Sequence, residues 1–266
     1  MIPFVKMSAG GNDFILIDNR RGIFNPLPSL IQKTCARKLG VGADGILLLE
    51  VSRNVDFKMR IFNPDGTEPE MCGNGARCIA RFANLLGIVE KKTIFETKAG
   101  FIQAEVSEEM VKIKLEDPKR IELYRRLDLD GEVLTIHFIN TGVPHSVLIE
   151  RDIDKIDVVK LGPQIRYHLD FYPDGTNVTW VKVLDKKTLK IRTYERGVED
   201  ETLACGTGAC AAACITYLLN LTSPPIDIET RGGEVLKVHF SGSNDKITDL
   251  LLEGEVKIIY KGELLL

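Results

Sequence analysis

The chain has 266 residues, of which 35 are Lys or Arg and 38 are Asp or Glu, giving a formal net charge of −3. This balance offers no basic stripe of the kind that binds nucleic acid, so we expect no nucleic-acid partner. No apolar run approaches the ~18 residues needed to cross a bilayer, and the N-terminus lacks the basic-then-apolar pattern of a secretory signal. We therefore expect a soluble, cytoplasmic protein that does not bind membranes.

Most of the chain outside the two helices that follow Cys72 and Cys205 predicts short strands. Aliphatic or β-branched runs bounded by Gly, Pro or Asp occur at 46–49, 112–115 and 178–181, and such runs are typical of strands. The segment after Ser29 predicts a helix that carries Cys35. This mixture of many predicted strands and few predicted helices favours an α+β fold.

Two longer helices are predicted directly after cysteines. Behind Cys72, apolar residues follow the i, i+3, i+4, i+7 spacing of one helix face up to Leu86, and Gly87 supplies a stop. Behind Cys205 the pattern repeats, and residues 206–220 contain no charge. A helix that is apolar on all sides is normally buried.

The sequences around these two cysteines belong to an internal repeat. Cys72-Gly-Asn-Gly-Ala recurs as Cys205-Gly-Thr-Gly-Ala, 133 positions later (205 − 72 = 133), and segment 57–63 aligns with 189–195 at an offset of 132. Such periodicity indicates duplicated structural units. The sequence predicts two pseudo-symmetric domains, each a largely antiparallel sheet wrapped around a central helix.

The boundary between the domains is expected in the charged, proline-containing segment 115–120. We assign residues 1–117 to the first domain and residues 118–255 to the second. Residues 256–266 run past the end of the second copy and are expected to return to the first domain.

The chemistry of the two helix starts suggests a function. The first N–H groups of a helix have no partner within it, and with the helix dipole they bind carboxylates or phosphates. The same field favours thiolate over thiol at Cys72 and Cys205. Two matched thiols suit an epimerase or racemase that removes an α-proton on one face and returns a proton on the other. Cys78, Cys210 and Cys214 lie inside the predicted helices and are interpreted as structural.

Other uses of the cysteines are less consistent with the sequence. A chain of this length without an export signal does not need disulfides, and Cys-x2-Cys or His-x3-His pairs typical of zinc sites are missing. P-loop and dinucleotide-binding motifs are also missing. We expect no metal and no cofactor.

Several segments resemble the diaminopimelate epimerase family. They are Phe62-Asn-Pro-Asp-Gly-Thr with Met71-Cys-Gly-Asn-Gly-Ala-Arg-Cys, Glu195-Arg-Gly with 201–209, Gly10-Gly-Asn-Asp-Phe, and Asn140-Thr-Gly-Val-Pro-His. The resemblance implies interconversion of LL- and meso-diaminopimelate without pyridoxal phosphate, on the path to lysine and peptidoglycan precursors. It also implies an active site in the interdomain cleft and a homodimer with Tyr260 near the contact.

The resemblance assigns roles residue by residue. Cys72 and Cys205 would be the base and acid, and His145 and Glu195 would assist them. The residues implied to bind the amino-acid substrate are Asn12, Asn63, Gly73, Asn74, Asn177, Arg196, Gly206 and Thr207. Two positions depart from the family pattern: Gly45 stands where Gln is common, and Val143 where Asn is common. These departures affect contacts to the distal end of the substrate.

Alternatives remain open from the residues themselves. His145 after Pro144 and Asn63 before Pro64 could be ordinary turn residues, and Glu195 with Arg196 could be a surface ion pair. At the level of function, the rivals are a proline or hydroxyproline racemase and a non-catalytic amino-acid-binding protein. A binding protein would not need matched thiols.

Overall fold

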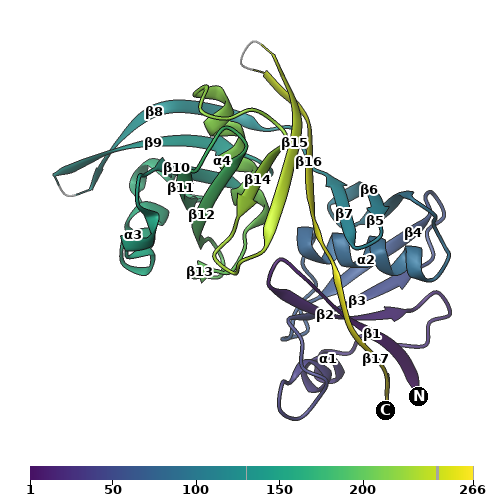
Figure 1. The fold of residues 1–266 in the computed structure, drawn as a ribbon. Coiled ribbons are helices and arrows are strands. Elements are labelled where there is room, and N and C mark those ends of the chain that lie inside the picture. Colours follow the sequence, from purple (N-terminus) through teal and green to yellow (C-terminus); the bar gives the residue numbers. More distant parts are fainter. Residues whose placement is uncertain (130, 244–245, 266) are drawn as a thin grey trace. The chain divides into compact units, whose positions relative to one another are not determined.

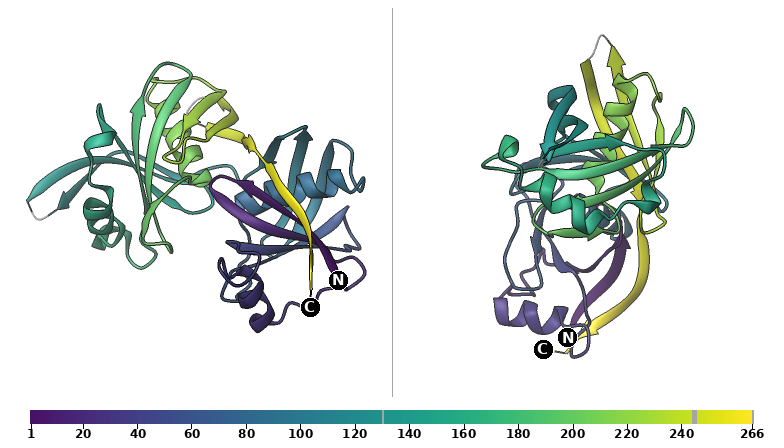
Figure 2. Two further views of the ribbon diagram at one scale, coloured as in Figure 1. Left: turned by 60° about the horizontal axis from the view of Figure 1, so that its bottom comes forward. Right: turned by 90° about the vertical axis from the view of Figure 1, so that its left-hand side faces the viewer.

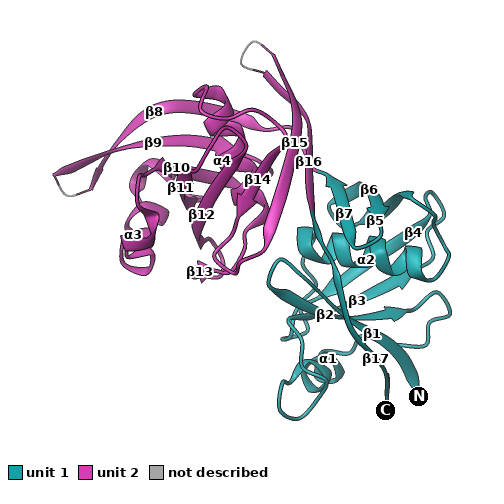
Figure 3. Ribbon diagram, in the orientation of Figure 1, with its two compact units in different colours: residues 1–114, 254–266 teal, residues 115–253 magenta. Residues whose placement is uncertain are grey.

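The computed structural model describes residues 1–129, 131–243 and 246–265. The chain forms two compact units, which are residues 1–114 with 254–266 (unit 1) and residues 115–253 (unit 2) (Figure 3). The divide falls beside segment 115–120. Residue 266, the last of the segment assigned to the first domain from sequence, lies outside the described residues.

Unit 1 surrounds its longer helix with strands (Figure 1). Its helices are α1 (Pro28–Cys35) and α2 (Gly73–Leu85). Its strands are β1 (Ile2–Ala9), β2 (Asn12–Asp18), β3 (Gly45–Glu50), β4 (Phe57–Phe62), β5 (Lys92–Thr97), β6 (Gly100–Ser107), β7 (Met110–Lys114) and β17 (Lys257–Leu264).

Unit 2 repeats this arrangement around α4 (Gly206–Leu218) and adds α3 (Val158–Arg166) with the short 3-10 helices η1 (Ile153–Lys155) and η2 (Leu169–Phe171). Its strands are β8 (Lys119–Leu129), β9 (Glu132–Asn140), β10 (Pro144–Ile149), β11 (Asn177–Val183), β12 (Thr188–Glu195), β13 (Asp200–Thr202), β14 (Ile226–Glu229), β15 (Val235–Ser243) and β16 (Lys246–Glu255), whose last two residues belong to unit 1. The α+β class with a sheet-dominated repeat is the one the sequence predicted.

The two units share strand register as well as element order. Within unit 1, β3 and β4 pair antiparallel with Ile46 opposite Phe62. Within unit 2, β11 and β12 pair antiparallel with Val178 opposite Tyr194. Both positions have moved by 132 residues (178 − 46 and 194 − 62), the same offset found in the sequence. The duplicated sequence therefore builds a duplicated backbone.

Parallel pairs complete each unit. β2 pairs with β3 and β4 with β5 in unit 1, while β10 pairs with β11 and β12 with β14 in unit 2. A parallel pair needs a crossover connection, and α2 and α4 lie in the connections that follow β4 and β12. The sequence predicted largely antiparallel sheets but not these parallel pairs.

The two central helices begin and end where their local sequence dictates. The helix predicted behind Cys72 spans Gly73–Leu85, and Gly87 follows its end with φ +69°, a left-handed conformation that glycine adopts without strain. The second spans Gly206–Leu218 and is buried continuously from Gly208 to Thr216. This confirms the prediction of a buried helix made from its lack of charge.

The C-terminal strand completes the sheet of unit 1. β17 pairs antiparallel with β1, placing Phe4 opposite Gly262, and the two strands lie side by side in Figures 1 and 2. Leu264 packs into the buried cluster around Phe4, Ile31 and Phe62. Without this strand, β1 would present an unpaired edge.

Every helix within 1–129, 131–243 and 246–265 is too short or too polar to cross a membrane.

Removing residues 257–266 should destabilise unit 1 selectively, because β1 loses its pairing partner and the core loses Leu264. The single tryptophan, Trp180, is buried in unit 2, so its fluorescence follows unit 2 while far-UV circular dichroism follows both units. We expect an earlier transition in circular dichroism and an unchanged fluorescence transition. Leu265→Ala, at an 80% exposed position, is the control; equal shifts in both signals would contradict this assignment.

Candidate active site

Each cysteine at a helix start is the N-cap of its helix. Cys72 precedes α2 with extended backbone, and its Sγ accepts a hydrogen bond from the N–H of Gly75 at 3.4 Å. Cys205 precedes α4 in the same way, and its Sγ accepts from the N–H of Gly208, also at 3.4 Å. The sulfur therefore takes the place that a Ser or Asp oxygen occupies in most helix caps.

The first-turn residues of both helices offer backbone donors. Gly73, Gly206 and Thr207 occupy the first positions of α2 and α4, where N–H groups have no carbonyl partner inside the helix. All three residues are half-buried. The arrangement can bind a carboxylate within reach of each unit's own thiol.

The surroundings of Cys205 disfavour the thiolate form that the sequence led us to expect. We expected the helix field to favour its thiolate, but burial, followed by the charge of Glu195, raises the pKa of the Cys205 thiol to about 12. Hydrogen bonds from Thr207 and Gly208 lower this pKa without overcoming the burial. Cys205 is therefore a thiol at neutral pH in this structure.

Glu195 is a direct partner of Cys205. It is the last residue of β12, and burial raises the pKa of its carboxyl, while a hydrogen bond with Cys205 acts in the opposite direction. A carboxyl with a raised pKa next to a thiol with a raised pKa is an arrangement in which a proton can be shared. The surface ion-pair reading of Glu195 is not supported by these contacts.

His145 lies inside unit 2 rather than on a surface turn. It is 0% exposed on β10, and its Nε2 lies 3.0 Å from Oγ1 of Thr207. Burial, helped by the positive charge of Arg196, lowers the pKa of His145 to about 3. The imidazole is therefore neutral at physiological pH and can both donate and accept a hydrogen bond.

Asn177 and Arg196 are joined by hydrogen bonds. The Asn177 side chain donates to the carbonyl of Pro144 at 2.9 Å and accepts from the backbone N–H of Arg196 at 2.8 Å. The guanidinium of Arg196 donates to the carbonyl of Asp174 at 2.9 Å. These contacts hold Arg196 at the end of β12, next to Glu195.

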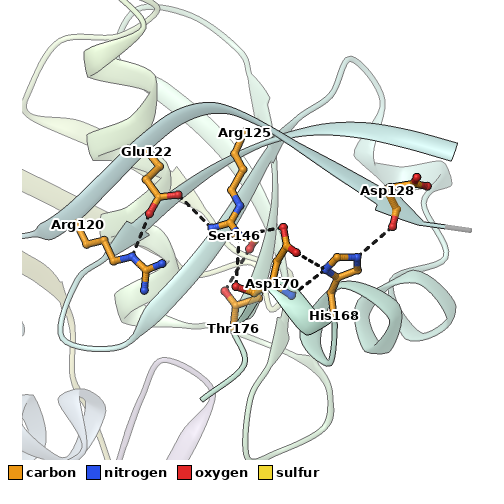
Figure 4. A network of polar contacts seen from close by, with 8 residues as sticks. All are labelled: Arg120, Glu122, Arg125, Asp128, Ser146, His168, Asp170 and Thr176. Atoms are coloured by element: carbon orange, nitrogen blue, oxygen red, sulfur yellow. Dashed lines mark hydrogen bonds and ion pairs between the residues drawn. The ribbon is translucent and has the colours of Figure 1, made fainter. Parts of the chain in front are cut away.

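Arg196 lines a cavity of about 270 Å³ in unit 2. Both charge signs occur on its walls, and its polar lining residues include Arg120, Asn140, Asp170, Asp174 and Arg196. Two of the lining residues, Arg120 and Asp170, belong to the polar network of Figure 4, in which Arg120 contacts Glu122 and Arg125 joins Glu122 to Asp170. Such a lining suits a ligand end that carries both an ammonium and a carboxylate group.

Unit 1 holds its predicted residues in a polar network of its own. The Asn74 side chain donates to Oδ1 of Asn12 at 2.8 Å and accepts from Arg77 at 2.7 Å. The Asn12 side chain donates in turn to Asp44 at 3.1 Å. The network fixes the orientation of both amides beside the start of α2.

Asn63 occupies the turn that its sequence suggested. Its carbonyl accepts from the N–H of Gly66 at 2.9 Å, and its side chain donates to Thr67 at 3.0 Å. The residue is half-buried. The turn reading is therefore correct, and a substrate contact remains a separate prediction.

The departure from the family pattern at Gly45 has a local explanation. A side chain at Gly45 would place its Cβ 2.6 Å from the carbonyl oxygen of Phe62 on the paired strand. At that distance the backbone of the paired strand would have to shift, which would destabilise the sheet. Val143 is half-buried, and its carbonyl accepts from the N–H of Thr141.

The buried threonines beside His145 were not predicted from the sequence. Thr179 Oγ1 lies 3.4 Å from Nδ1 of His145 and 3.2 Å from Oγ1 of Thr193. A signal was present, because the internal alignment at 132 residues puts Leu47 and Ile61 opposite them. A polar residue where the repeat has a buried aliphatic one indicates a specific contact.

The fold places the chain in a known structural class. Over 100% of its length it resembles a PhzF-family phenazine biosynthesis protein of Bacillus anthracis (TM-score 0.73, 17% identity, 99% of that chain). It also resembles a probable proline racemase of Agrobacterium radiobacter (TM-score 0.69, 14% identity, 100% of this chain and 93% of the other). The chain therefore has the fold of these proteins.

Sequence comparison identifies the family. The model of the family described as diaminopimelate epimerase matches residues 4–121 and 137–258. The chain is 46% identical to the diaminopimelate epimerase of Aquifex aeolicus (99% of this chain, 98% of the relative) and 41% identical to that of Chlorobaculum tepidum (98% and 100%). The chain belongs to the diaminopimelate epimerase family.

The network beside Asn12 predicts an acid-dependent contribution to stability. Burial alone would raise the pKa of Asp13, but hydrogen bonds and charges from Arg37 and Lys6 outweigh it and lower the pKa from 3.8 to about 2. Because the folded pKa is depressed, the stabilisation is present above pH ~4 and is lost as pH falls through ~2.

Asp13→Asn should therefore lower the free energy of unfolding at pH 7 by about 1–2 kcal/mol, allowing for the partial exposure of the pair. The difference should fall to about half by pH 3, as measured by urea unfolding followed by circular dichroism. Asp18→Asn, which breaks the exposed pair with Arg20, is the control and should cost about 0–1 kcal/mol. A pH-independent difference for Asp13→Asn would contradict the ion-pair explanation.

Proposed function

We propose that the protein interconverts LL- and meso-diaminopimelate by transferring an α-proton between two thiols, without a cofactor. The observation that carries this proposal is the duplicated N-cap cysteine, because binding alone does not need two matched thiols. Membership of the diaminopimelate epimerase family supports the substrate. The proposal places the reaction in the biosynthesis of lysine and peptidoglycan precursors.

The protonated state of the Cys205 thiol in unit 2 suggests which cysteine donates a proton and which removes one. The thiolate of Cys72 takes the α-proton as its S–H bond forms, and the C–H electron pair remains on the substrate. The thiol of Cys205 then donates its proton to the opposite face of the α-carbon and becomes a thiolate. In the reverse direction the two cysteines exchange roles. The high pKa of Cys205 supports its role as the donor in the first direction.

His145 and Glu195 are proposed to assist Cys205. The hydrogen bond between Glu195 and the thiol and the short path from His145 through Thr207 support this role. Both groups change the cost of forming a thiolate at Cys205, because one contributes charge and the other directs a donor toward the sulfur. Neither group needs to contact the substrate carbon.

Substrate binding is assigned to groups near the helix starts. The backbone N–H groups of Gly73, Gly206 and Thr207 are proposed to hold the α-carboxylate and to stabilise the carbanion-like charge. The side chains proposed to bind the rest of the substrate are Asn12, Asn63, Asn74, Asn177 and Arg196. The cavity beside Arg196 supports this, since its lining carries both charge signs.

We further propose that each unit is an epimerase-like domain and that the protein is a cytoplasmic homodimer. Exposed apolar side chains on β17 support a dimer contact there, since Ile259 is 52% and Tyr260 43% exposed. Light scattering after size exclusion should give twice the chain mass of 29.7 kDa. Tyr260→Asp should shift the mass toward the monomer, and a monomeric wild type would exclude the dimer.

Single cysteine substitutions test the two-thiol reaction. Cys72→Ala and Cys205→Ala should each lower epimerisation of LL-diaminopimelate by more than ~10³-fold, because each removes one obligatory proton carrier. The product is measured by chiral chromatography. Cys35→Ala and Cys214→Ala, which change buried cysteines away from the helix starts, should retain activity and serve as matched controls.

The outcomes separate the rival functions. Turnover of proline but not of diaminopimelate would move the assignment to a proline racemase. Binding of diaminopimelate without turnover, unchanged in Cys72→Ala and Cys205→Ala, would indicate an amino-acid-binding protein.

A further inference from the structure

Two buried threonines in unit 2 have no part in the proposed mechanism. Thr179 on β11 and Thr193 on β12 are opposite residues of an antiparallel pair, and their Oγ1 atoms lie 3.2 Å apart. Both are buried, and Thr179 Oγ1 also lies 3.4 Å from Nδ1 of His145. Thr179 therefore contacts Nδ1 of the imidazole, while Thr207 contacts the other ring nitrogen, Nε2.

The contacts form a continuous path to the sulfur of Cys205. Nε2 of His145 lies 3.0 Å from Oγ1 of Thr207, and that hydroxyl lies 3.5 Å from Sγ of Cys205. A thiolate can only accept hydrogen bonds, and the thiol form, whose S–H donates to Glu195, also accepts through its sulfur. In both states Thr207 therefore donates its single proton to Sγ of Cys205.

This requirement fixes the other protons in the path. The oxygen of Thr207 then accepts from Nε2–H of His145, so Nδ1 of the neutral ring has no proton and accepts from Thr179. Every hydrogen bond in the path is therefore donated in the direction of the sulfur. Hydrogen bonds in such a chain polarise one another, and each becomes stronger. The tautomer of a histidine is set by the partner of its second nitrogen.

The equivalent place in unit 1 shows that packing does not require these hydroxyls. The internal offset of 132 residues puts Leu47 and Ile61 where unit 2 has the two threonines. A methyl group on Gly75 would lie 3.3 Å from Leu47 and 3.4 Å from Ile61, and one on Gly208 would lie 3.1 Å from each threonine hydroxyl. The same space under the helix is therefore filled by aliphatic groups in one copy and by hydroxyls in the other.

We propose that Thr179, held by Thr193, is a positioning residue for proton transfer at Cys205. Its hydroxyl donates to Nδ1 of His145 and fixes the imidazole tautomer whose Nε2–H supports Thr207. The kinetic part of this proposal rests on the proposed epimerase function; the tautomer part does not.

Kinetic comparison of isosteric variants tests the first part. Thr179→Val removes the hydroxyl and keeps the shape, so kcat should fall about five- to tenfold, the effect of losing one hydrogen bond. KM should change by less than about twofold, because the substrate contacts remain. Thr179→Ser keeps a hydroxyl and should restore most of kcat.

A control variant accounts for the general cost of losing a buried hydroxyl. Thr222→Val breaks a comparable pair with Thr216 (2.8 Å) near the other end of α4, and it should leave kcat unchanged. Equal losses in Thr179→Val and Thr222→Val would indicate a purely structural role and overturn the proposal.

A double-mutant cycle tests whether Thr179 acts through His145. In a His145→Gln background, Thr179→Val should lower kcat by less than about twofold, because the group it positions is gone. The full five- to tenfold effect in that background would contradict the proposal.

Nitrogen-15 NMR of the imidazole tests the tautomer without any activity. The signals of His145 are assigned by their loss in His145→Gln, and Nε2 should be protonated and Nδ1 unprotonated in the wild type. Thr179→Val should mix the two tautomers, whereas Thr179→Ser should not. A wild-type Nδ1–H tautomer would overturn the proposal; the expected tautomer in a protein that does not turn over diaminopimelate would refute only the proposed function.

Discussion

The hydrogen bond from a first-turn N–H to a cysteine sulfur is the interaction on which the site depends. At both helix starts the sulfur caps the helix, so its position is fixed by the backbone rather than by a flexible side chain. The glycines of the repeated pentapeptide allow this close approach, because the space next to Gly75 and Gly208 is already occupied. Moving either sulfur would leave a helix uncapped. The fold therefore couples the placement of each thiol to the stability of its helix.

Duplication gives the two thiols the same backbone but different surroundings. In unit 2 the cap is surrounded by Glu195, a neutral His145 and hydroxyl groups. In unit 1, Leu47 and Ile61 take the places of the two threonines and Asn74 that of Thr207. The position equivalent to His145 is Asp13, which is paired with Lys6. A reaction that takes a proton on one face and returns one on the other needs carriers in different proton states. The difference between the two copies is a physical basis for that asymmetry.

The helix starts, the repeat and the class of fold could be predicted because they depend on local sequence. The recurring pentapeptide and the 132-residue offset predict a duplicated unit, and the strand register shows the same offset. The raised pKa of Cys205 could not be predicted, since it results from burial by residues distant in the chain. The parallel pairs and the ion pair of Asp13 with Lys6 are also non-local. Thr179 looked like an ordinary β-branched strand residue, and only its contact with His145 distinguishes it. The roles of the site residues remain predictions.

In the proposed reaction one thiol removes the α-proton and the other supplies a different proton. The most direct measurement is the isotope content of both isomers in the first few per cent of turnover of LL-diaminopimelate in deuterated water. We expect deuterium at the α-carbon of the meso product, while the recovered LL substrate retains its original hydrogen. Deuterium entering both isomers at the same rate, or product that keeps the substrate's own α-hydrogen, would contradict it.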